Sequence, residues 1–381
     1  MLTPDFAALL QGHATLDATS AIEMLCPLKG TRIPLDAVEA ELIGRLTAHD
    51  WHDVDELAAD GPLDAHSIVA LAERGALISD ADTAEATAYR EGEARLESIG
   101  WHPLATIYHA MSRWQGVVGD EGNRDHSESA HHDRLVANTN RYGVLPPHFP
   151  RREDSISQHV LPHDPLQDSF AQVLRARRTT RHFDTSAILS MADFSRVLQC
   201  SFGALGTEEL APGVVAIRRT SASGGALHPI EAYPLVIRVE GLKPGYYHYQ
   251  AGDHSLALLK PLEEEEARRQ AEALTIGQTY FAEAHALVIH VARLDRHHWK
   301  YRRHPKAYKA VFLDSGHLSQ TFYLLAAECG LGAFYTAAIN DADIGTQLRL
   351  DPLAEIAIGA NGLGIIDPTR NSLHLRPMPL A

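Results

Sequence analysis

Three short segments of the sequence carry most of the residues that could do chemistry. Residues 296–309, RHHWKYRRHPKAYK, hold six Lys or Arg, three His, three aromatic residues and no acidic residue. Residues 177–183, RRTTRHF, place three arginines around a pair of threonines. Residues 220–229, TSASGGALHP, place two adjacent glycines directly after Ser223. Such patterns suit an anionic ligand or a proton transfer.

The arginine-rich segment suits a phosphate group. Arg177, Arg178 and Arg181 offer planar guanidinium groups that bind phosphate through paired hydrogen bonds, and Thr179 adds a hydroxyl between them. The alternative is the end of a helix, where cations interact favourably with the helix dipole. The arginine pattern alone does not separate the two.

The glycine pair suits a close approach of the backbone to a ligand. Gly224 and Gly225 lack the side chains that would block it, and Ser223 can donate a hydrogen bond. The segment has neither the GxGxxG pattern of dinucleotide-binding folds nor the GxxxxGK[ST] pattern of NTPases, so neither class follows from it. A plain turn is the alternative.

The composition is that of an ordinary globular protein. The chain has 381 residues, 45% of them hydrophobic and 22% charged, enough for about two domains. Its formal net charge of -15 argues against a general nucleic-acid binder. The three cysteines form no disulfide or zinc pattern, and the histidines near residues 126–133 lack the spacing of a metal site, so we expect no metal. No signal peptide or membrane-length apolar run is present, and we expect a soluble, cytoplasmic protein.

Residues 36–80 predict three short helices followed by a strand. Val38, Leu42 and Leu46 have the spacing of one helix face, and Asp64 and Gly75 are suitable caps for a later helix. This pattern resembles a winged helix-turn-helix, with a small helical bundle as the alternative. The candidate recognition helix, residues 64–74, contains one arginine, which argues against DNA reading.

The C-terminal half predicts an α+β domain. Helices are expected at residues 168–183 and 190–205, the latter with Ser190 as its N-cap, and a long buried helix before Gly330. Strands are expected at 230–240, 285–294 and 353–365. We therefore divide the chain into a winged-helix-like domain at 1–95, a connector at 96–164 and an α+β domain at 165–381.

Taken in order, these segments resemble a known family. RRTTRHF resembles the phosphate-binding opening of the nitroreductase fold, and SASGGALHPIEAYPLVI and GYYHYQAGDHSLALL resemble the following parts of its SagB-type branch. YKAVFLDSGHLSQTFYLLAAECGLGAFYTAAINDADIGTQLRLD and AEIAIGANG are similar to the central helix and closing strand of that branch. The resemblance covers about residues 165–366. The chain as a whole is most similar to SagB/ThcOx-type dehydrogenases of peptide maturation, whose N-terminal extensions can include a winged-helix-like module.

The resemblance implies an FMN enzyme of nitroreductase-like fold. Such a fold has a central mixed or antiparallel sheet flanked by helices, and forms an intertwined homodimer with flavin at the subunit interface. The positions that match flavin contacts are Arg177, Arg178, Thr179, Arg181, Ser223, Gly224, Gly225, Leu227, Gln320 and Gly359. Among these, Gly359 is expected on the closing turn.

The resemblance also gives the cationic segment a catalytic meaning. WKYRR matches the Lys-Tyr pair that azoline-oxidising members of the branch use in catalysis, which implies that Lys300 and Tyr301 are catalytic. Oxidising an azoline to an azole removes a hydride, taken by flavin N5, and a proton, taken by a base. Nearby cations, here Arg296, Arg302 and Arg303, would favour the neutral form that a lysine base needs. A basic surface loop is the alternative.

The leading hypothesis is therefore an FMN-dependent dehydrogenase that oxidises azolines in ribosomally made peptides and passes the electrons to oxygen. Its expected partners are a precursor peptide, a cyclodehydratase complex and a second copy of the chain, with no nucleic acid and no membrane. The winged-helix-like domain could bind the precursor's leader by adding it to a sheet edge. Two alternatives stay open: an NAD(P)H-dependent nitroreductase or quinone reductase, and a non-catalytic scaffold or regulator.

Overall fold

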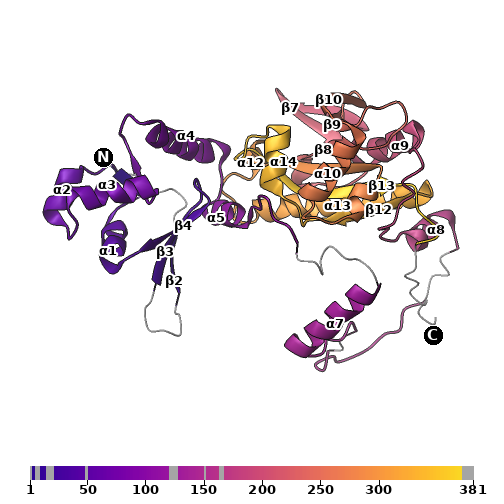
Figure 1. Ribbon diagram of the computed structural model, residues 1–381, viewed down its shortest axis with the longest axis horizontal. Helices are drawn as coiled ribbons and strands as arrows, with labels where there is room; N and C mark the ends of the chain where they lie inside the picture. The colour runs from indigo at the N-terminus through magenta and orange to yellow at the C-terminus, as the bar shows by residue number, and fades with distance from the viewer. Residues whose placement is uncertain are drawn as a thin grey trace.

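The computed structural model describes residues 2–4, 9–13, 21–47, 50–119, 128–149, 152–162 and 167–370. An N-terminal and a C-terminal group of helices and strands lie side by side, with helix α7 (Glu128–Tyr142) apart from both (Figure 1). His126 lies outside the described residues, as does the side chain of His131.

The N-terminal part contains the three helices and the strand expected at 36–80. They are α1 (Ala37–Arg45), α2 (Val54–Asp60), α3 (Ala65–Arg74) and β5 (Leu77–Ser79). The expected caps of α3 are confirmed, because the Asp64 side chain accepts a hydrogen bond from the Ser67 amide and Gly75 has a φ of 87°. Strand β1 (Leu2–Pro4) pairs with β5.

An antiparallel sheet that the sequence patterns did not predict precedes these helices. Its strands are β2 (Leu9–His13), β3 (Ala21–Cys26) and β4 (Thr31–Leu35), in that order. Met24 of β3 and Ile33 of β4 are buried in one cluster with Leu42, Ile68 and Leu71 of the helices. The N-terminal part therefore has a core of its own.

Two helices lead out of the N-terminal part. They are α4 (Ala84–Ile99) and α5 (Pro103–Ser112). Leu96 and Trp101 are buried in the core of the C-terminal part, so α4 runs from one part to the other. The region expected to be a connector is more ordered than its composition indicated, because it contains α5, which begins with Pro103 in its first turn, and α7.

The C-terminal part is built on a six-stranded sheet in which all neighbours are antiparallel. The order is β10 (Ser255–Pro261), β9 (Gly245–Gln250), β8 (Ile230–Val236), β11 (Ala286–Arg293), β13 (Glu355–Gly364) and β12 (Gly332–Thr336). Central strand β11 sends Val288 and Ala292 to one face and Leu287 and Ile289 to the other, and all four are fully buried. Alternation with apolar residues on both faces requires a covering layer on each side.

Helices form these two layers. One face is covered by α9 (Met191–Phe202) and α13 (Ala307–Glu328), and the other by α10 (Glu264–Leu274), α11 (Tyr280–Glu283) and α14 (Asp341–Leu348). The Ser190 side chain caps α9 at the Asp193 amide, as expected. The predicted α+β architecture, an antiparallel sheet flanked by helices, is confirmed (Figure 1).

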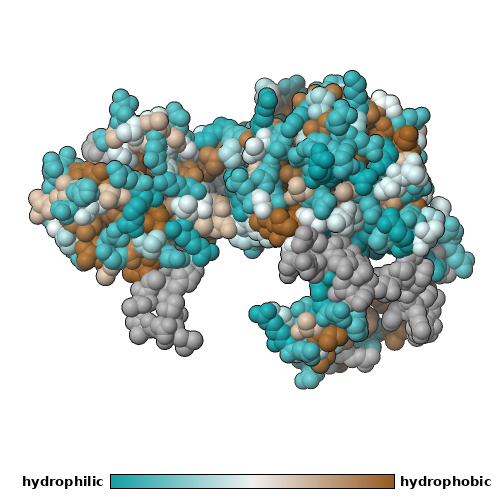
Figure 2. All heavy atoms as spheres, in the orientation of Figure 1, coloured by the Kyte–Doolittle hydropathy of each residue, from teal (hydrophilic) through white to brown (hydrophobic). Residues whose placement is uncertain are grey.

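Shorter elements surround this core. They are α8 (Ser169–Ala176), the hairpin β6 (Gly206–Ala211) and β7 (Val214–Arg218), the single turn η1 (Gly224–Ala226), and α12 (Leu294–Lys300). Figure 2 shows a mostly polar surface over the C-terminal part and more apolar side chains on the N-terminal part. Among the described helices, none has the length and apolar character needed to cross a membrane.

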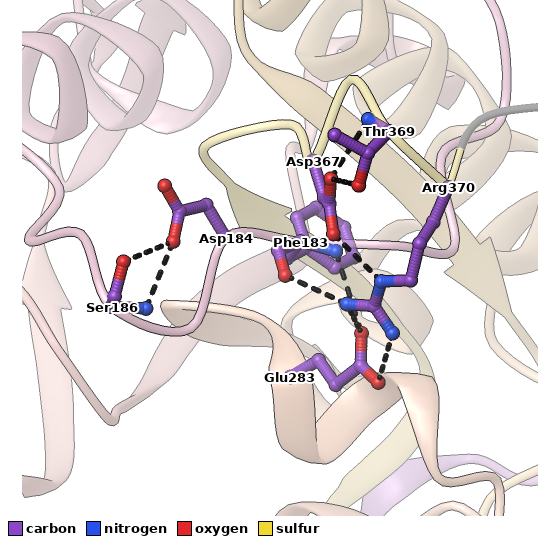
Figure 3. A network of polar contacts seen from close by, with 7 residues as sticks. All are labelled: Phe183, Asp184, Ser186, Glu283, Asp367, Thr369 and Arg370. Carbon is purple, nitrogen blue, oxygen red and sulfur yellow. Dashed lines mark hydrogen bonds and ion pairs between the residues drawn. The ribbon is translucent and has the colours of Figure 1, made fainter.

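A polar network fixes the chain after the last strand. Arg370 donates hydrogen bonds to Glu283 of α11 (2.9 Å), to Asp367 (2.7 Å) and to the Phe183 carbonyl (3.0 Å), so one guanidinium joins three segments (Figure 3). Hydrogen bonds from Thr369 and Arg370 lower the pKa of Asp367 from 3.8 to about 2. The contribution of Asp367 to stability is therefore complete above its ordinary pKa and is lost as the pH falls through about 2.

Replacing Arg370 by Ala should lower the free energy of unfolding by about 1 kcal/mol, because Glu283 and the Phe183 carbonyl lose donors at a partly exposed site. Urea unfolding at pH 7 measures the change. Arg152→Ala is the control, since Arg152 pairs with Asp154 where both side chains are mostly exposed, and it should leave stability unchanged within the error of the measurement. Equal effects of the two substitutions would show that the Arg370 network has no special role.

Candidate functional site

Residues 220–229 form a glycine loop, which a buried carboxylate attaches to helix α13. Asp314 is 3% exposed, and its two oxygens accept hydrogen bonds from the Ser223 hydroxyl (2.5 Å) and the Gly224 amide (2.9 Å). The Ser223 hydroxyl also accepts a hydrogen bond from the His228 amide at 2.9 Å. Ser223 therefore uses its hydroxyl inside the protein, and the backbone of the glycines is what the loop offers to a ligand.

This loop is held in an unusual backbone conformation. Gly225 has a φ of 63°, and two residues with side chains, Ala226 (57°) and His228 (47°), are also left-handed. Such conformations cost energy in non-glycine residues and concentrate at functional sites. An open cavity of about 470 Å³ lies beside the loop, with Ser223, Ala226 and His228 in its lining. Burial, with the Arg219 charge, lowers the pKa of His228, so its imidazole is neutral at pH 7.

Lys300 and Tyr301 lie against the same loop. The Lys300 Nζ donates to the Gly225 carbonyl at 3.4 Å. A Cβ added to Gly225 would lie 3.0 Å from that Nζ and would collide with the Tyr301 hydroxyl. The structure thus brings the two predicted catalytic residues together with the predicted glycine loop, and a side chain at residue 225 would have to displace the ends of both.

The arginines of the cationic segment each have hydrogen-bond or ion-pair partners of their own. The Arg296 Nε donates to the Leu227 carbonyl at 2.6 Å. Arg302 donates to the Ser98 carbonyl at 2.7 Å, and Arg303 forms an ion pair with Glu97 at 2.7 Å. α4 offers carbonyl and carboxylate acceptors that draw the Arg302 and Arg303 side chains to it, and the expected electrostatic effect of these arginines on the lysine stays a prediction.

The arginine-rich segment lies beside α13 as well. The Thr179 and Tyr323 hydroxyls are 3.3 Å apart, the Arg177 guanidinium lies 5.6 Å from the centre of the Tyr323 ring, and Arg181 lies 5.9 Å from that of Tyr280. Within the described parts of the chain, no carboxylate forms an ion pair with Arg177, Arg178 or Arg181. Three neighbouring guanidinium groups without acidic partners suit a bound anion.

In one chain, the arginine-rich segment and the glycine loop lie on opposite sides of α13. The loop is attached at Asp314 and, through Ser221, at Thr321. Both positions lie on one side of the helix, and the arginine segment contacts Tyr323, about half a turn out of phase with them. The exposed side chains of Leu313 and Gln320 lie on the helix face between them. The two segments that sequence analysis assigned to one site therefore contact α13 from opposite sides within a single chain.

The remaining predicted positions are less accessible than Gln320. The Leu227 side chain is 9% exposed. Gly359 is buried inside strand β13, paired with His290, rather than on the expected closing turn. A Cβ there would collide with the Tyr335 hydroxyl, which explains a glycine within a strand.

A buried polar chain lies beneath this strand. His290 is fully buried, its Nδ1 is 2.8 Å from the Ser315 hydroxyl, and that hydroxyl is 2.9 Å from the hydroxyl of Tyr335. Burial lowers the pKa of His290 to about 3, so the imidazole is neutral. The sequence patterns predicted neither this run of buried polar residues nor the role of Asp314. The signal for Asp314 was an acidic residue within a helix that was predicted to be buried.

Comparison with known proteins now identifies the family. A model described as the nitroreductase family matches residues 174–365, about half of the chain. The chain belongs to the nitroreductase family. It is 30% identical over 189 residues to a predicted nitroreductase of Methanocaldococcus jannaschii, covering 49% of this chain and 88% of that protein.

Two further similarities are to a curated protein and to a solved complex. The chain is 29% identical over 145 residues to the trifolitoxin-processing protein TfxB of Rhizobium leguminosarum bv. trifolii, which is 38% of this chain and 39% of that relative. A solved structure of the E. coli microcin synthetase McbBCD complex with truncated pro-MccB17 bound matches 71% of this chain and 94% of the compared chain. In that match the TM-score is 0.49 and the identity 18%.

Replacing Asp314 by Ala should free the glycine loop of this nitroreductase-family chain, because Ser223 and Gly224 lose their shared acceptor. We expect hydrogen exchange of the backbone amides at 223–228 to become faster, and the unfolding free energy to fall by about 1–3 kcal/mol. Exchange measured by mass spectrometry tests this. Asp343→Ala is the control, since Asp343 accepts a backbone hydrogen bond from Gly116, outside the loop. Unchanged exchange at 223–228 would contradict the role of Asp314.

Proposed function

We propose that the chain is an FMN-dependent dehydrogenase that oxidises thiazoline or oxazoline rings to azoles during maturation of ribosomally synthesised peptides. The observation that carries the proposal is the contact of Lys300 and Tyr301 with Gly225, which joins two proton-transfer groups to the loop expected beside the flavin ring. The resemblance to SagB/ThcOx-type dehydrogenases and the relative named for trifolitoxin processing support a peptide as substrate.

The residues present fit FMN. Arg177, Arg178 and Arg181 have no acidic partners among the described residues and would hold the phosphate together with Thr179. The backbone of Gly224 and Gly225 would lie against the ring system of the flavin. Ser223 and Leu227 would support this loop, with Gln320 exposed on α13. Gly359 would support the wall of the site from within the sheet. FMN bound there supplies the acceptor for a hydride.

Lys300 and Tyr301 would handle the proton. Aromatisation of an azoline removes one hydrogen with two electrons and a second one as a proton, so a base is needed beside the ring. Lys300 in its neutral form would take that proton, and Tyr301, in contact with the same loop, would orient it. Dioxygen is the proposed final electron acceptor, because the sequence has no nicotinamide-binding fingerprint.

We propose a homodimer whose sites are shared between two chains. The phosphate segment and the glycine loop lie on opposite sides of α13, so each site would take one segment from each copy. Apolar side chains exposed along this region fit a second copy: Leu313 is 65% exposed, Phe170 63% and Leu174 42%. A second copy packed on α8 and α13 would cover these side chains.

The proposed division of the chain is into residues 1–95, 96–164 and 165–381. The N-terminal part is the proposed binding unit for the leader segment of the precursor peptide. In its three-stranded sheet, β4 lies at one edge and could pair with an extended peptide. A cyclodehydratase that makes the azoline is the proposed partner enzyme. Fluorescence anisotropy of a labelled leader with the full chain tests this, and no binding at about 100 µM would be evidence against it.

Lys300→Ala should keep FMN bound and abolish turnover, because the substitution removes the base without touching the phosphate site. We expect kcat with a synthetic thiazoline peptide to fall by about 10²–10⁴ while the flavin absorbance stays unchanged. Lys309→Ala, an exposed lysine of the same cationic segment, is the control and should behave as wild type. Normal turnover by Lys300→Ala would overturn the assignment.

Assays of the wild-type protein also distinguish the proposed function from a second candidate function. The family name favours an NAD(P)H-dependent nitroreductase or quinone reductase. Rapid reduction of the flavin by NADPH together with no oxidation of the thiazoline peptide would establish that function instead.

Replacing Arg177 and Arg181 together by Ala should release FMN, because the phosphate of FMN would lose two of its cationic partners. Absorbance of the purified protein measures the loss, and full retention of flavin would contradict the phosphate role. Mixing this variant with Lys300→Ala tests the shared site. A mixed dimer has one site with both defects and one with neither, so activity should return, whereas sites built within single chains would stay inactive.

A further inference from the structure

Four consecutive residues at the end of α12, 300–303, contact two different parts of the molecule. Lys300 and Tyr301 lie against Gly225 of the glycine loop. Arg302 and Arg303 turn the other way and contact the end of α4, which is about 200 residues earlier in the chain. The segment that carries the proposed catalytic pair is therefore held from both sides.

Arg302 binds the C-terminal end of α4. Its guanidinium donates twice to the Ser98 carbonyl, once at 2.7 Å. The last carbonyls of a helix have no partner within the helix, and the helix dipole favours a cation there. Arg302 satisfies both requirements, so the contact is specific to this end of α4.

Arg303 adds a backbone and a side-chain contact. Its amide donates to the Gly100 carbonyl at 2.7 Å, and its guanidinium pairs with Glu97 at 2.7 Å. Its φ of 53° is left-handed, a conformation that persists in a residue with a side chain when the surrounding contacts enforce it. The contacts with α4 hold the chain in this turn together with a hydrogen bond from the His304 amide to the Tyr301 carbonyl at 3.1 Å.

Gly100 makes the close approach possible. It ends α4 with a φ of 84°, and a Cβ at this position would lie 2.5 Å from the Arg302 Cγ. A larger residue would thus push Arg302 away from the helix end. The next residue, Trp101, is fully buried, donates from Nε1 to the Leu353 carbonyl at 2.8 Å, and lies 5.4 Å from the His298 ring of α12. The end of α4 is therefore anchored in the C-terminal core and supports α12 as well.

We propose that the C-terminal turn of α4, residues 97–100, is a positioning device that holds Lys300 and Tyr301 against the glycine loop through Arg302 and Arg303. The proposal rests on the proposed function of Lys300 and Tyr301. It assigns Glu97, Gly100, Arg302 and Arg303 as positioning residues. The other end of α4 belongs to the N-terminal part, where Glu85 pairs with Lys29 of the β3–β4 turn at 3.0 Å. The same helix thus joins the proposed peptide-binding unit to the proposed catalytic pair.

The test replaces both arginines by Ala in the full-length flavoprotein. We expect kcat for a synthetic thiazoline peptide to fall about 10- to 100-fold with little change in KM or flavin content, because the pair is displaced while the binding residues stay. Arg303→Lys in the wild-type background should keep most of the activity, since it keeps the charge opposite Glu97. Arg95→Ala is the matched control, because Arg95 joins the same helix to Asp351 at 2.8 Å, on a different loop.

A second measurement does not depend on turnover. Acetylation of lysines by an N-hydroxysuccinimide ester, followed by mass spectrometry, reports how firmly the Lys300 amine is held at the Gly225 carbonyl. We expect Lys300 to react faster in the double variant, and Lys309 to react at the same rate in both proteins. Unchanged kcat and unchanged Lys300 labelling, or equal losses in Arg95→Ala, would overturn the positioning role.

The two readouts separate this inference from the proposed function. A wild-type protein that does not oxidise the thiazoline peptide, with Lys300 labelling that still rises in the double variant, would refute the function and leave the positioning intact. A wild-type protein and a double variant that both turn over normally, with equal labelling, would refute the positioning and leave the function intact.

Discussion

A buried carboxylate that must be satisfied organises the candidate site. Leaving Asp314 without partners in the core would be costly, and it takes both of its hydrogen bonds from the glycine loop. The loop is therefore fixed to α13, and the Gly225 carbonyl is presented to Lys300. Because residue 225 has no side chain, Tyr301 can lie against the same backbone. The placement of the proposed catalytic pair thus depends on a buried carboxylate whose hydrogen bonds are made within the protein.

Helix geometry then limits what one chain can do alone. The glycine loop and the arginine-rich segment are attached to α13 at positions half a turn out of phase, so the body of the helix separates them. Motion of either loop would not remove that barrier, since both are bonded to the helix or to the sheet beside it: the Thr180 amide donates to the Ala333 carbonyl at 2.9 Å. A second copy of α13 packed against the exposed face is the simplest arrangement that brings both kinds of segment to one ligand.

Local signals allowed much of the fold to be predicted, and long-range contacts account for what was missed. Asp64, Gly75 and Ser190 cap helices through bonds to residues a few positions away, which a sequence pattern contains. Asp314 and Ser223 are 91 residues apart, and Arg302 and Ser98 are 204 apart, so no pattern in one sequence shows that they meet. Gly359 was placed on a closing turn by the family resemblance, whereas here it lies within a strand, where the close approach of Tyr335 excludes a side chain.

The charge of the cationic segment also has a different use from the one its composition indicates. A guanidinium bound to helix carbonyls, or paired with a carboxylate, has its donors occupied, so Arg302 and Arg303 act as structural links between α4 and the site. Lys300 itself is exposed within one chain, so water reaches its amine. The proposed reaction would be shielded from this water only if another group covered the site. The second chain and the bound peptide are the groups that would cover it, so the exclusion of water would come with the assembly of the site.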